Sequence, residues 1–165
     1  MDNIEIEQLN IDDIESVQEY SKLIIEVMEE FNSNEITESQ ISFAGITEII
    51  VRKKFSNFHK KYPTENYDGY NTVQFIAKCK EKIIGLLEIE AKCLIQLFYV
   101  KKDFQNKGIG RELLNYSIKY FMDEGIKLNY YRVFSSTYAQ EIYKSLGFIG
   151  DKNELYYYFA EKSWR

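Results

Sequence analysis

Two glycines with a single residue between them stand in the stretch KKDFQNKGIGR, residues 101–111. This stretch lies between a strand-like apolar run and an amphipathic run. The start of a helix offers backbone N–H groups without intrahelical partners, together with the positive end of the helix dipole. Glycine lets a phosphate come close to the backbone and tolerates a positive φ. Gly108 and Gly110 in the first turn of a helix therefore predict an anion site, with a pyrophosphate as its ligand.

The side chains around the glycines leave more than one interpretation open. Gln105, Lys107 and Arg111 are placed to add phosphate contacts, but a solvated basic rim explains the charges as well. Two well-known phosphate loops are excluded, because Leu113 stands where a dinucleotide fingerprint needs its third glycine and because Lys107 precedes the first glycine. Glycines that shape the turn without holding a ligand are the remaining alternative.

A second motif, YAQEIYKSLGF (residues 138–148), has the spacing of a short helix that ends at a glycine. Ala139 and Tyr143 are four residues apart, so they are neighbours on the surface of such a helix. With the glycine turn before it and one strand between, this order closely resembles the GCN5-related N-acetyltransferase (GNAT) family. Residues 98–110 resemble the strand end and the Gln-x-x-Gly-x-Gly turn of the family, and residues 139–148 resemble its Ala-x-x-x-Tyr-x-x-x-Gly-Phe pattern.

Within the family, FSSTYAQEIYKSLGF (residues 134–148) is similar to a bacterial subgroup written V-N-S-S-P-Y-A-V-x-x-Y-x-x-L-G-F. The chain departs from it at Phe134, where Asn is usual, and at Thr137, where Pro is usual. Proline at the first helical position is merely favourable. The absent Asn changes a contact to the cofactor or the substrate.

The resemblance implies an α+β fold with a mixed, mostly antiparallel, splayed sheet and about four helices, in the order β-α-α-β-β-β-α-β-α-β. It implies acetyl-CoA in the gap between the strand ending at Val100 and residues 128–135. The pantetheine arm would pair with the free strand edge, and the pyrophosphate would rest on backbone N–H groups. The implied cofactor-binding residues are Phe98, Tyr99, Val100, Gln105, Asn106, Lys107, Gly108, Ile109, Gly110, Arg111 and Ser136.

The chemistry implied by the family is direct transfer of the acetyl group to a primary amine, without a covalent enzyme intermediate. Tyr143 would protonate the leaving thiolate, because a phenol of pKa near ~10 is protonated at neutral pH. A backbone N–H near the end of the 93–100 strand would stabilise the oxyanion. Glu88 is the candidate base; Glu90 shares its face by alternation, and a solvated pair of carboxylates is the alternative. Gln96 could hold a water, and no metal is implied.

The elements that position these residues follow from hydrophobic periodicity. Met122 and Ile142 are expected on the buried faces of their helices. The loop at 60–71 and the first two helices would form the side that receives the acceptor. The predicted elements are a strand at 3–10, helices at 12–31 and 37–55, a loop at 59–71, a three-strand meander at 72–100, a helix at 108–122, a strand at 128–135, a helix at 137–146 and one or two strands at 148–164.

Length and composition set the remaining expectations. The 165 residues predict a single domain, residues 1–165, and the net charge of −5 argues against nucleic-acid binding. Cys79 and Cys93 are interpreted as buried free thiols, and no apolar run is long enough to span a membrane, so a cytoplasmic location is expected.

The expected partner is a small-molecule or peptide amine that accepts the acetyl group. A homodimer through residues 156–159 stays open, although a core strand is the commoner explanation.

Two other functions remain alternatives at this stage. One is a non-catalytic acyl-CoA-binding sensor or interaction module, which Phe134 and the unassigned base permit and which the retained Tyr143 argues against. The other is a nucleotide-binding or purely structural domain, which the acidic balance and the absent Walker residues disfavour.

Overall fold

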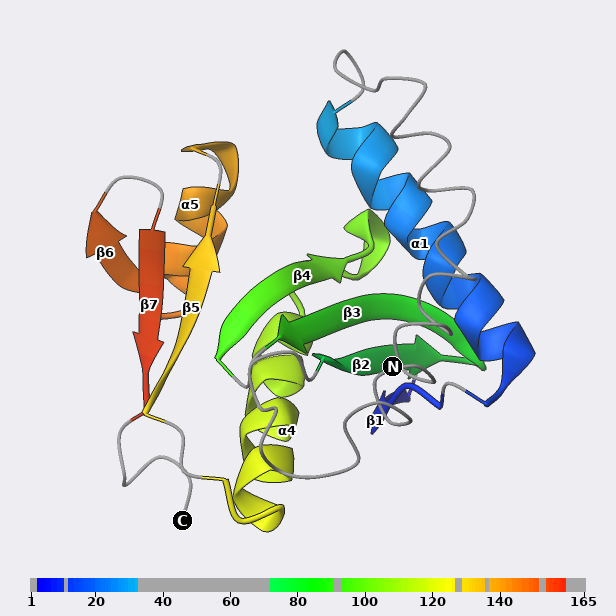
Figure 1. Cartoon of the computed structure of the whole chain (residues 1–165). Helices are drawn as coiled ribbons and strands as arrows, with labels where there is room; N and C mark the ends of the chain where they lie inside the picture. The colour runs from blue at the N-terminus through cyan, green and yellow to red at the C-terminus, as the bar shows by residue number, and fades with distance from the viewer. Residues whose placement is uncertain are drawn as a thin grey trace.

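The computed structural model describes residues 3–10, 12–32, 72–90, 93–126, 129–135, 137–151 and 154–159. Within them, seven strands form one sheet in the order β1-β2-β3-β4-β5-β7-β6 (Figure 1). The elements are β1 (Ile4–Gln8), α1 (Ile14–Asn32), β2 (Thr72–Cys79), β3 (Lys82–Glu90), β4 (Leu94–Val100), η2 (Lys102–Phe104), α4 (Ile109–Asp123), β5 (Tyr130–Phe134), α5 (Thr137–Ser145), β6 (Ile149–Asp151) and β7 (Glu154–Tyr158).

The predicted fold class is confirmed. β2, β3 and β4 form the expected antiparallel meander, and β1 adds to its edge in antiparallel orientation. β4 and β5 are parallel, and α4 is the crossover that such a pair requires. The chain ends in two strands, of which β7 pairs with β5 and β6 pairs with β7.

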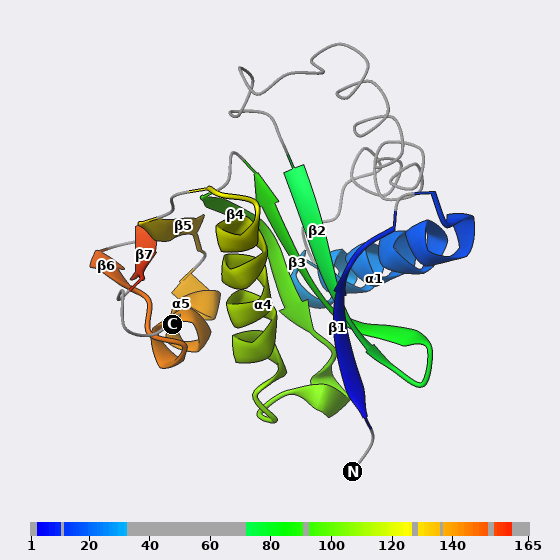
Figure 2. The same ribbon diagram turned by 90° about the horizontal axis from the view of Figure 1, so that it is seen from below.

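The sheet carries a separate apolar layer on each face, because side chains alternate along β2 and β3. Phe75 and Leu87 point to the face covered by α4, where Leu113 is fully buried. Ile76 and Leu86 point to the other face, where they pack with residues of α1. Figure 2 shows α1 and α4 on opposite sides of these strands.

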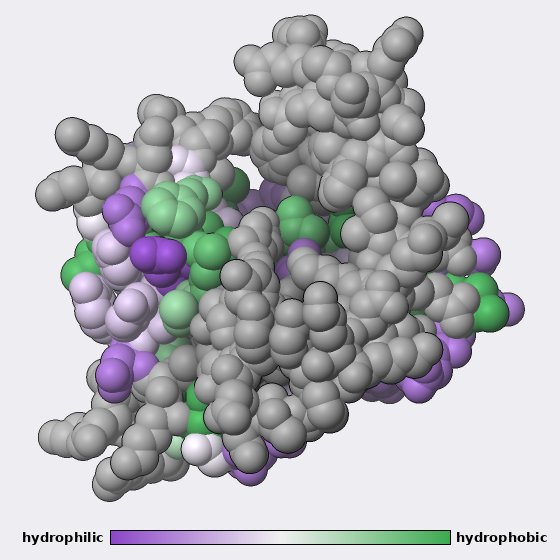
Figure 3. Space-filling view, in the orientation of Figure 1, coloured by the Kyte–Doolittle hydropathy of each residue, from purple (hydrophilic) through white to green (hydrophobic). Residues whose placement is uncertain are grey.

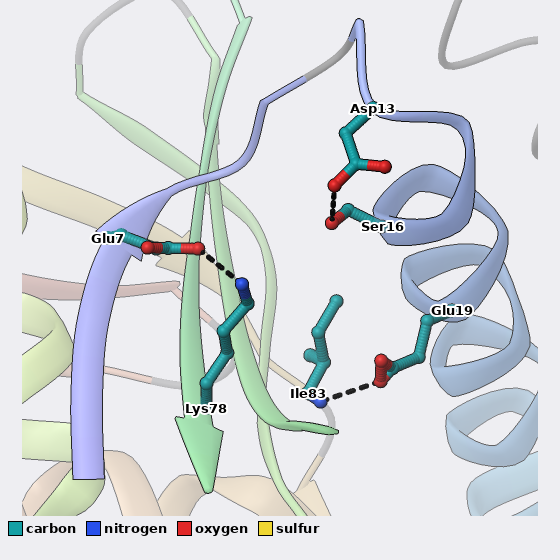
Figure 4. Close-up of polar contacts among 6 residues, drawn as sticks. All are labelled: Glu7, Asp13, Ser16, Glu19, Lys78 and Ile83. Atoms are coloured by element: carbon teal, nitrogen blue, oxygen red, sulfur yellow. Dashed lines mark hydrogen bonds and ion pairs between the residues drawn. The ribbon is translucent and has the colours of Figure 1, made fainter. Parts of the chain in front are cut away.

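Helix α1 is fixed at its start and one turn later by polar contacts (Figure 4). The Ser16 hydroxyl donates a 2.8 Å hydrogen bond to Asp13, the residue that precedes the helix. Glu19 Oε2 then accepts a 2.7 Å hydrogen bond from the backbone N–H of Ile83 in β3. This bond holds the helix against the strand, and Tyr20, the next residue, is fully buried between them.

Two apolar residues expected in the core are exposed instead. Met122 is 46% exposed and Ile142 is 53% exposed. Phe121 takes the sheet-facing position in α4, and Tyr143 and Leu146 pack against the core from α5 and its end. Since successive residues of a helix are turned by roughly 100°, Met122 and Ile142 point away from the layers that their neighbours fill.

Other expectations meet the structure only in part. Cys79 is a buried free thiol as predicted, but Cys93 is only partly buried because it lies in the turn before β4. The helix expected at 37–55 and the loop at 59–71, with His59, lie outside the described residues. In the part of the chain that the structure describes, no helix is long and apolar enough to cross a membrane.

Tyr131 provides a test of the layer beneath α4. Its buried hydroxyl lies 2.7 Å from Ser117 Oγ, which itself donates to the Leu114 carbonyl, so Tyr131 is the donor of the pair. We expect Tyr131→Phe to lower the free energy of unfolding by about 1 kcal/mol, the net value of one hydrogen bond. Thermal unfolding should show Tm lower by about 2–4 °C. Tyr158→Phe, at an exposed position, is the control, and an equal fall for both variants would contradict the prediction.

Candidate active site

The turn between β4 and α4 leaves N–H groups unpaired at the start of α4. Asn106 and Gly108 have positive φ values of 62° and 81°, and Gly108 is the N-cap. No side chain of the described residues caps this helix. The Glu112 N–H is the first to bond within the helix, to the Gly108 carbonyl at 3.0 Å, so the N–H groups of residues 109–111 lack intrahelical partners. The backbone therefore has the form that an anion site requires.

The two glycines of the turn are there for different reasons. Gly108 adopts the left-handed conformation, and a Cβ at this position would meet no atom within 4 Å. At Gly110 a Cβ would lie 3.4 Å from Cζ of Phe98, which is an ordinary van der Waals contact. Gly108 thus shapes the turn, and Gly110 lies where α4 meets the end of β4.

The side chains around the turn contact the protein itself. Gln105 Nε2 donates a 2.8 Å hydrogen bond to the Val100 carbonyl and so ties the turn to the end of β4. Arg111 Nη2 donates to the Ser145 carbonyl at 3.5 Å, and Lys107 Nζ lies 5.6 Å from the centre of the Phe104 ring. These contacts leave the backbone as the main candidate for phosphate binding.

Next to this turn the sheet opens between β4 and β5. Leu94 pairs with Arg132 and Ile95 with Val133, after which the two strands separate (Figure 1). The pairing of β4 with β3 shifts at the same place, so that Gln96 has no opposite residue. Such a bulge bends its strand. Within the described residues, the β4 edge from 97 to 100 pairs with no strand on the β5 side, which is the splay that the resemblance implies.

Tyr143 lies on the α4 side of this opening. Its ring centre is 6.0 Å from that of Phe98 in β4 and 5.2 Å from that of Phe148. Burial raises the pKa of Tyr143 to about 12, so its hydroxyl is protonated throughout the neutral range. The described part of the chain offers this hydroxyl no hydrogen bond. Tyr143 is thus a proton donor without a structural partner in these segments.

Glu88 lies on the opposite face of the sheet, the one that α1 covers. It is 8% exposed, and its Oε1 accepts a 2.8 Å hydrogen bond from Nε2 of Gln74. Glu88 pairs with Leu97, the first residue after the bulge in β4. The predicted acid and the predicted base therefore lie on opposite faces of the sheet, and Glu88 is one strand away from the opening.

Sequence reasoning missed two residues of this region. Gln74 and Tyr20 are buried on the same face as Glu88. Gln74 stands in a run, TVQFIAKC, whose residues 73–77 are all buried, and a glutamine in such a strand signals a buried polar contact. Tyr20 carries no such signal, because a tyrosine at a helical apolar position is ordinary core. Ser136 and the side chains of Glu90, Gln96 and Ala139 lie outside what the structure describes.

Comparison with known proteins assigns the class. A family model described as acetyltransferase (GNAT) domain matches residues 18–157. This fold and this match define an acetyl-CoA-dependent acyltransferase. The chain belongs to the GNAT family, as its two motifs led us to expect. No curated protein sequence matches it.

Solved structures resemble the chain in fold over nearly its whole length. The PaiA N-acetyltransferase from Thermoplasma acidophilum, in complex with coenzyme A, has a TM-score of 0.67 at 17% identity, covering 93% of this chain and 96% of its own. A GNAT acetyltransferase from Staphylococcus aureus Mu50 has a TM-score of 0.62 at 16% identity, covering 96% and 100%. The aminoglycoside acetyltransferase meta-AAC0020 from an uncultured soil metagenomic sample, in complex with trehalose, has a TM-score of 0.59 at 19% identity. The match covers 95% of this chain and 95% of that one.

Gly108 and Gly125 provide a matched pair for testing the turn. Both have positive φ, 81° and 77°, and both have open space where a Cβ would stand, but Gly125 lies at the far end of α4. We expect Gly108→Ala and Gly125→Ala each to strain the backbone by about 1–2 kcal/mol. Gly108→Ala alone should weaken acetyl-CoA binding, by about tenfold, because the N–H groups beside it are displaced. Calorimetry checks this, and equal affinities for the two variants would contradict it.

Proposed function

We propose that the protein is an N-acetyltransferase that moves the acetyl group of acetyl-CoA to a primary amine by direct attack in a ternary complex. The observation that carries this proposal is the short pairing of β4 with β5, through Leu94 and Ile95, beside a start of α4 that no side chain of the described residues caps. An extended chain with amide groups can add to a strand edge, and a phosphate can bind at a helix start. Pantetheine and pyrophosphate are these two groups, joined in one molecule.

The donor is held by backbone in this proposal. Its pantetheine arm pairs with β4 at Phe98, Tyr99 and Val100, and its pyrophosphate rests on the N–H groups of residues 105–111. The complex of the Thermoplasma acidophilum relative with coenzyme A supports a coenzyme site on this fold. The proposal treats residues 1–165 as a single acetyltransferase domain. The two free cysteines favour a reducing, cytoplasmic compartment.

Glu88 and Tyr143 move the protons. Glu88 takes one proton from the acceptor ammonium, and the lone pair that this frees on nitrogen forms a bond to the thioester carbon. A backbone N–H of β4 stabilises the negative charge on the carbonyl oxygen until the C–S bond breaks. Tyr143 gives its hydroxyl proton to the departing thiolate and recovers one from the nitrogen as the amide forms. One proton, left on Glu88, is released to water for each amine acetylated.

The acceptor is a small-molecule or peptide amine that enters on the face covered by α1. Arg132 and Phe134 of β5 line the same face beyond the opening, because Tyr131 and Val133 point to the core beneath α4. Figure 3 shows this side of the molecule, at the left, as a mixture of hydrophilic and hydrophobic surface. A mixed surface suits a polar organic amine. The aminoglycoside acetyltransferase among the relatives gives one example of such an acceptor.

A sensor that binds acyl-CoA without turnover is the second candidate. Phe134 favours it, because this residue stands where the subgroup has Asn and is 60% exposed at the end of β5. Tyr143 argues against it, because this partly buried tyrosine beside the opening is retained.

Tyr143→Phe separates the enzyme from the sensor. In the wild type, acetyl-CoA at about a hundred times its Kd adds about 2.7 kcal/mol of stability, or about 5–10 °C in Tm. We expect the variant to keep this shift and to lose about 10²-fold in kcat, measured as thiol release with a panel of amines, because the thiolate leaves unprotonated. Tyr116→Phe, on the exposed side of α4, is the control. A wild-type protein that binds acetyl-CoA but releases no thiol would support the sensor.

The raised pKa of Tyr143 predicts the alkaline side of the pH profile. Its acid form persists until the pH approaches about 12, because burial disfavours the phenolate. We therefore expect kcat at saturating amine to stay level between about pH 8 and pH 10, after subtraction of the enzyme-free rate. A fall of kcat centred near pH ~10, the ordinary phenol pKa, would contradict the buried position of this proton donor.

A further inference from the structure

Three polar side chains are buried together in the apolar layer between α1 and the sheet. Tyr20 is 0% exposed, Gln74 1% and Glu88 8%. Gln74 and Glu88 stand opposite each other in the β2–β3 pair and share the 2.8 Å hydrogen bond. Tyr20 reaches the same layer from α1, where it packs with Ile76 and Leu86, the next residues on this face of the two strands.

Among the residues that the structure describes, the fully buried Tyr20 hydroxyl has no hydrogen-bond partner. Buried hydroxyls nearly always have one. Burial, and then the negative charge of Glu88, raise the pKa of Tyr20 well above its ordinary value. The hydroxyl is therefore neutral at physiological pH and lies within electrostatic reach of the candidate base.

The cluster lies next to the opening of the sheet. Glu88 pairs with Leu97, and Ile95, two residues earlier in β4, is the last residue paired with β5. Leu97 itself packs against the layer that contains Tyr20. A group held between Tyr20 and Glu88 would therefore lie on the α1 face of β3 and β4, one strand in from the opening where the thioester would be.

We propose that Tyr20, Gln74 and Glu88 form the subsite of the reacting nitrogen and that this subsite takes an unbranched primary amine, R–CH2–NH3+. The inference rests on the proposed acetyl transfer. The Tyr20 oxygen accepts one N–H of the ammonium, and Glu88, held by Gln74, takes the proton that the nitrogen loses. The nitrogen then attacks as described above, so the overall balance of atoms and protons is unchanged.

The burial of the three groups selects the shape of the amine. Their neighbours are close-packed apolar side chains, among them Ile76 and Leu86. A methylene is slim enough to follow the nitrogen into such a layer, whereas a substituent on the carbon next to the nitrogen has to displace packed side chains. Side-chain and alkyl amines are therefore accepted, and α-branched amines, including the α-amino group of a peptide, are disfavoured.

Tyr20→Phe is the first test, with Tyr131→Phe as its matched control. Both remove one buried tyrosine hydroxyl, but Tyr131 has a partner in Ser117 and lies on the other face of the sheet. For Tyr20→Phe we expect kcat/KM for the amine to fall about tenfold or more, with KM for acetyl-CoA within about twofold of wild type and Tm equal or higher. For Tyr131→Phe we expect a lower Tm and kcat/KM within about twofold of wild type.

A pair of amines is the second test. Hexylamine and 2-aminohexane have closely similar basicity and differ in branching at the carbon that bears the nitrogen. With wild-type enzyme and acetyl-CoA, we expect kcat/KM for hexylamine to exceed that for 2-aminohexane by about tenfold or more, a range that one misplaced methyl group can produce. Tyr20→Phe should lower the rate with hexylamine.

The outcomes separate this inference from the proposed function. If the wild type transfers acetyl groups but Tyr20→Phe does so equally well, or loses Tm and activity together as a packing defect would, the subsite is wrong and the acetyltransferase stands. The subsite is also wrong if the wild type acetylates hexylamine and 2-aminohexane equally well. It is wrong too if the protein binds acetyl-CoA but acetylates neither amine. A wild-type protein that does not bind acetyl-CoA overturns the proposed function itself.

Discussion

The short pairing of β4 with β5 is the constraint on which the rest of this structure depends. Two residue pairs hold the strands together, and the bulge at Gln96 then turns β4 away. Phe98, beyond the bulge, packs between Gly110 of α4 and the ring of Tyr143. These contacts hold the end of β4 against α4 and α5 on that face of the sheet. In the described part of the chain, β4 beyond Ile95 therefore pairs with no strand on its β5 side, and an extended ligand can add to that edge.

An open sheet also joins its two faces. In a continuous sheet, side chains on opposite faces are separated by the backbone layer and cannot reach the same bond. Here Glu88 lies on the face of α1, one strand in from the opening, and Tyr143 lies on the face of α4. A thioester in that opening is accessible to a base from one side and to an acid from the other. In the proposed mechanism, the short β4–β5 pairing separates the two proton transfers in space.

The sequence predicted the elements well because local signals and tertiary packing agree over most of them. Gly108 marks the start of α4 because its positive φ is a local backbone requirement. Burial was harder to predict. Met122 and Ile142 fit a helical apolar pattern but face outward, since the direction of each helix against the sheet, which no local signal contains, decides which side is covered. Arg111 donates to the Ser145 carbonyl at the end of α5, a contact that no local signal predicts, and its phosphate contact stays a prediction.

Residues of the candidate site that belong to a sequence motif were predictable. Residues that only the packing of the fold brings together were not. Tyr143 stands in a recognisable pattern, whereas Tyr20 resembles any core tyrosine in a helix. What sets Tyr20 apart is its unpartnered hydroxyl, which only the folded arrangement of α1 against β2 and β3 reveals. Gln74 was predictable in part. Its strand suggests that it is buried, but its hydrogen bond to Glu88 depends on the register between β2 and β3.

The unsatisfied polar atoms point to the same place. In the described part of the chain, two buried side-chain atoms lack a hydrogen-bond partner, Tyr20 Oη and Arg132 Nε. Both lie on the face of α1, and Arg132 pairs with Leu94 at the start of the splay. An unpartnered buried polar group costs about 1–3 kcal/mol, which Phe at position 20 would avoid. Natural sequences break such local rules chiefly at functional sites. The cost is therefore understandable if the polar partner of Tyr20 arrives with the acceptor.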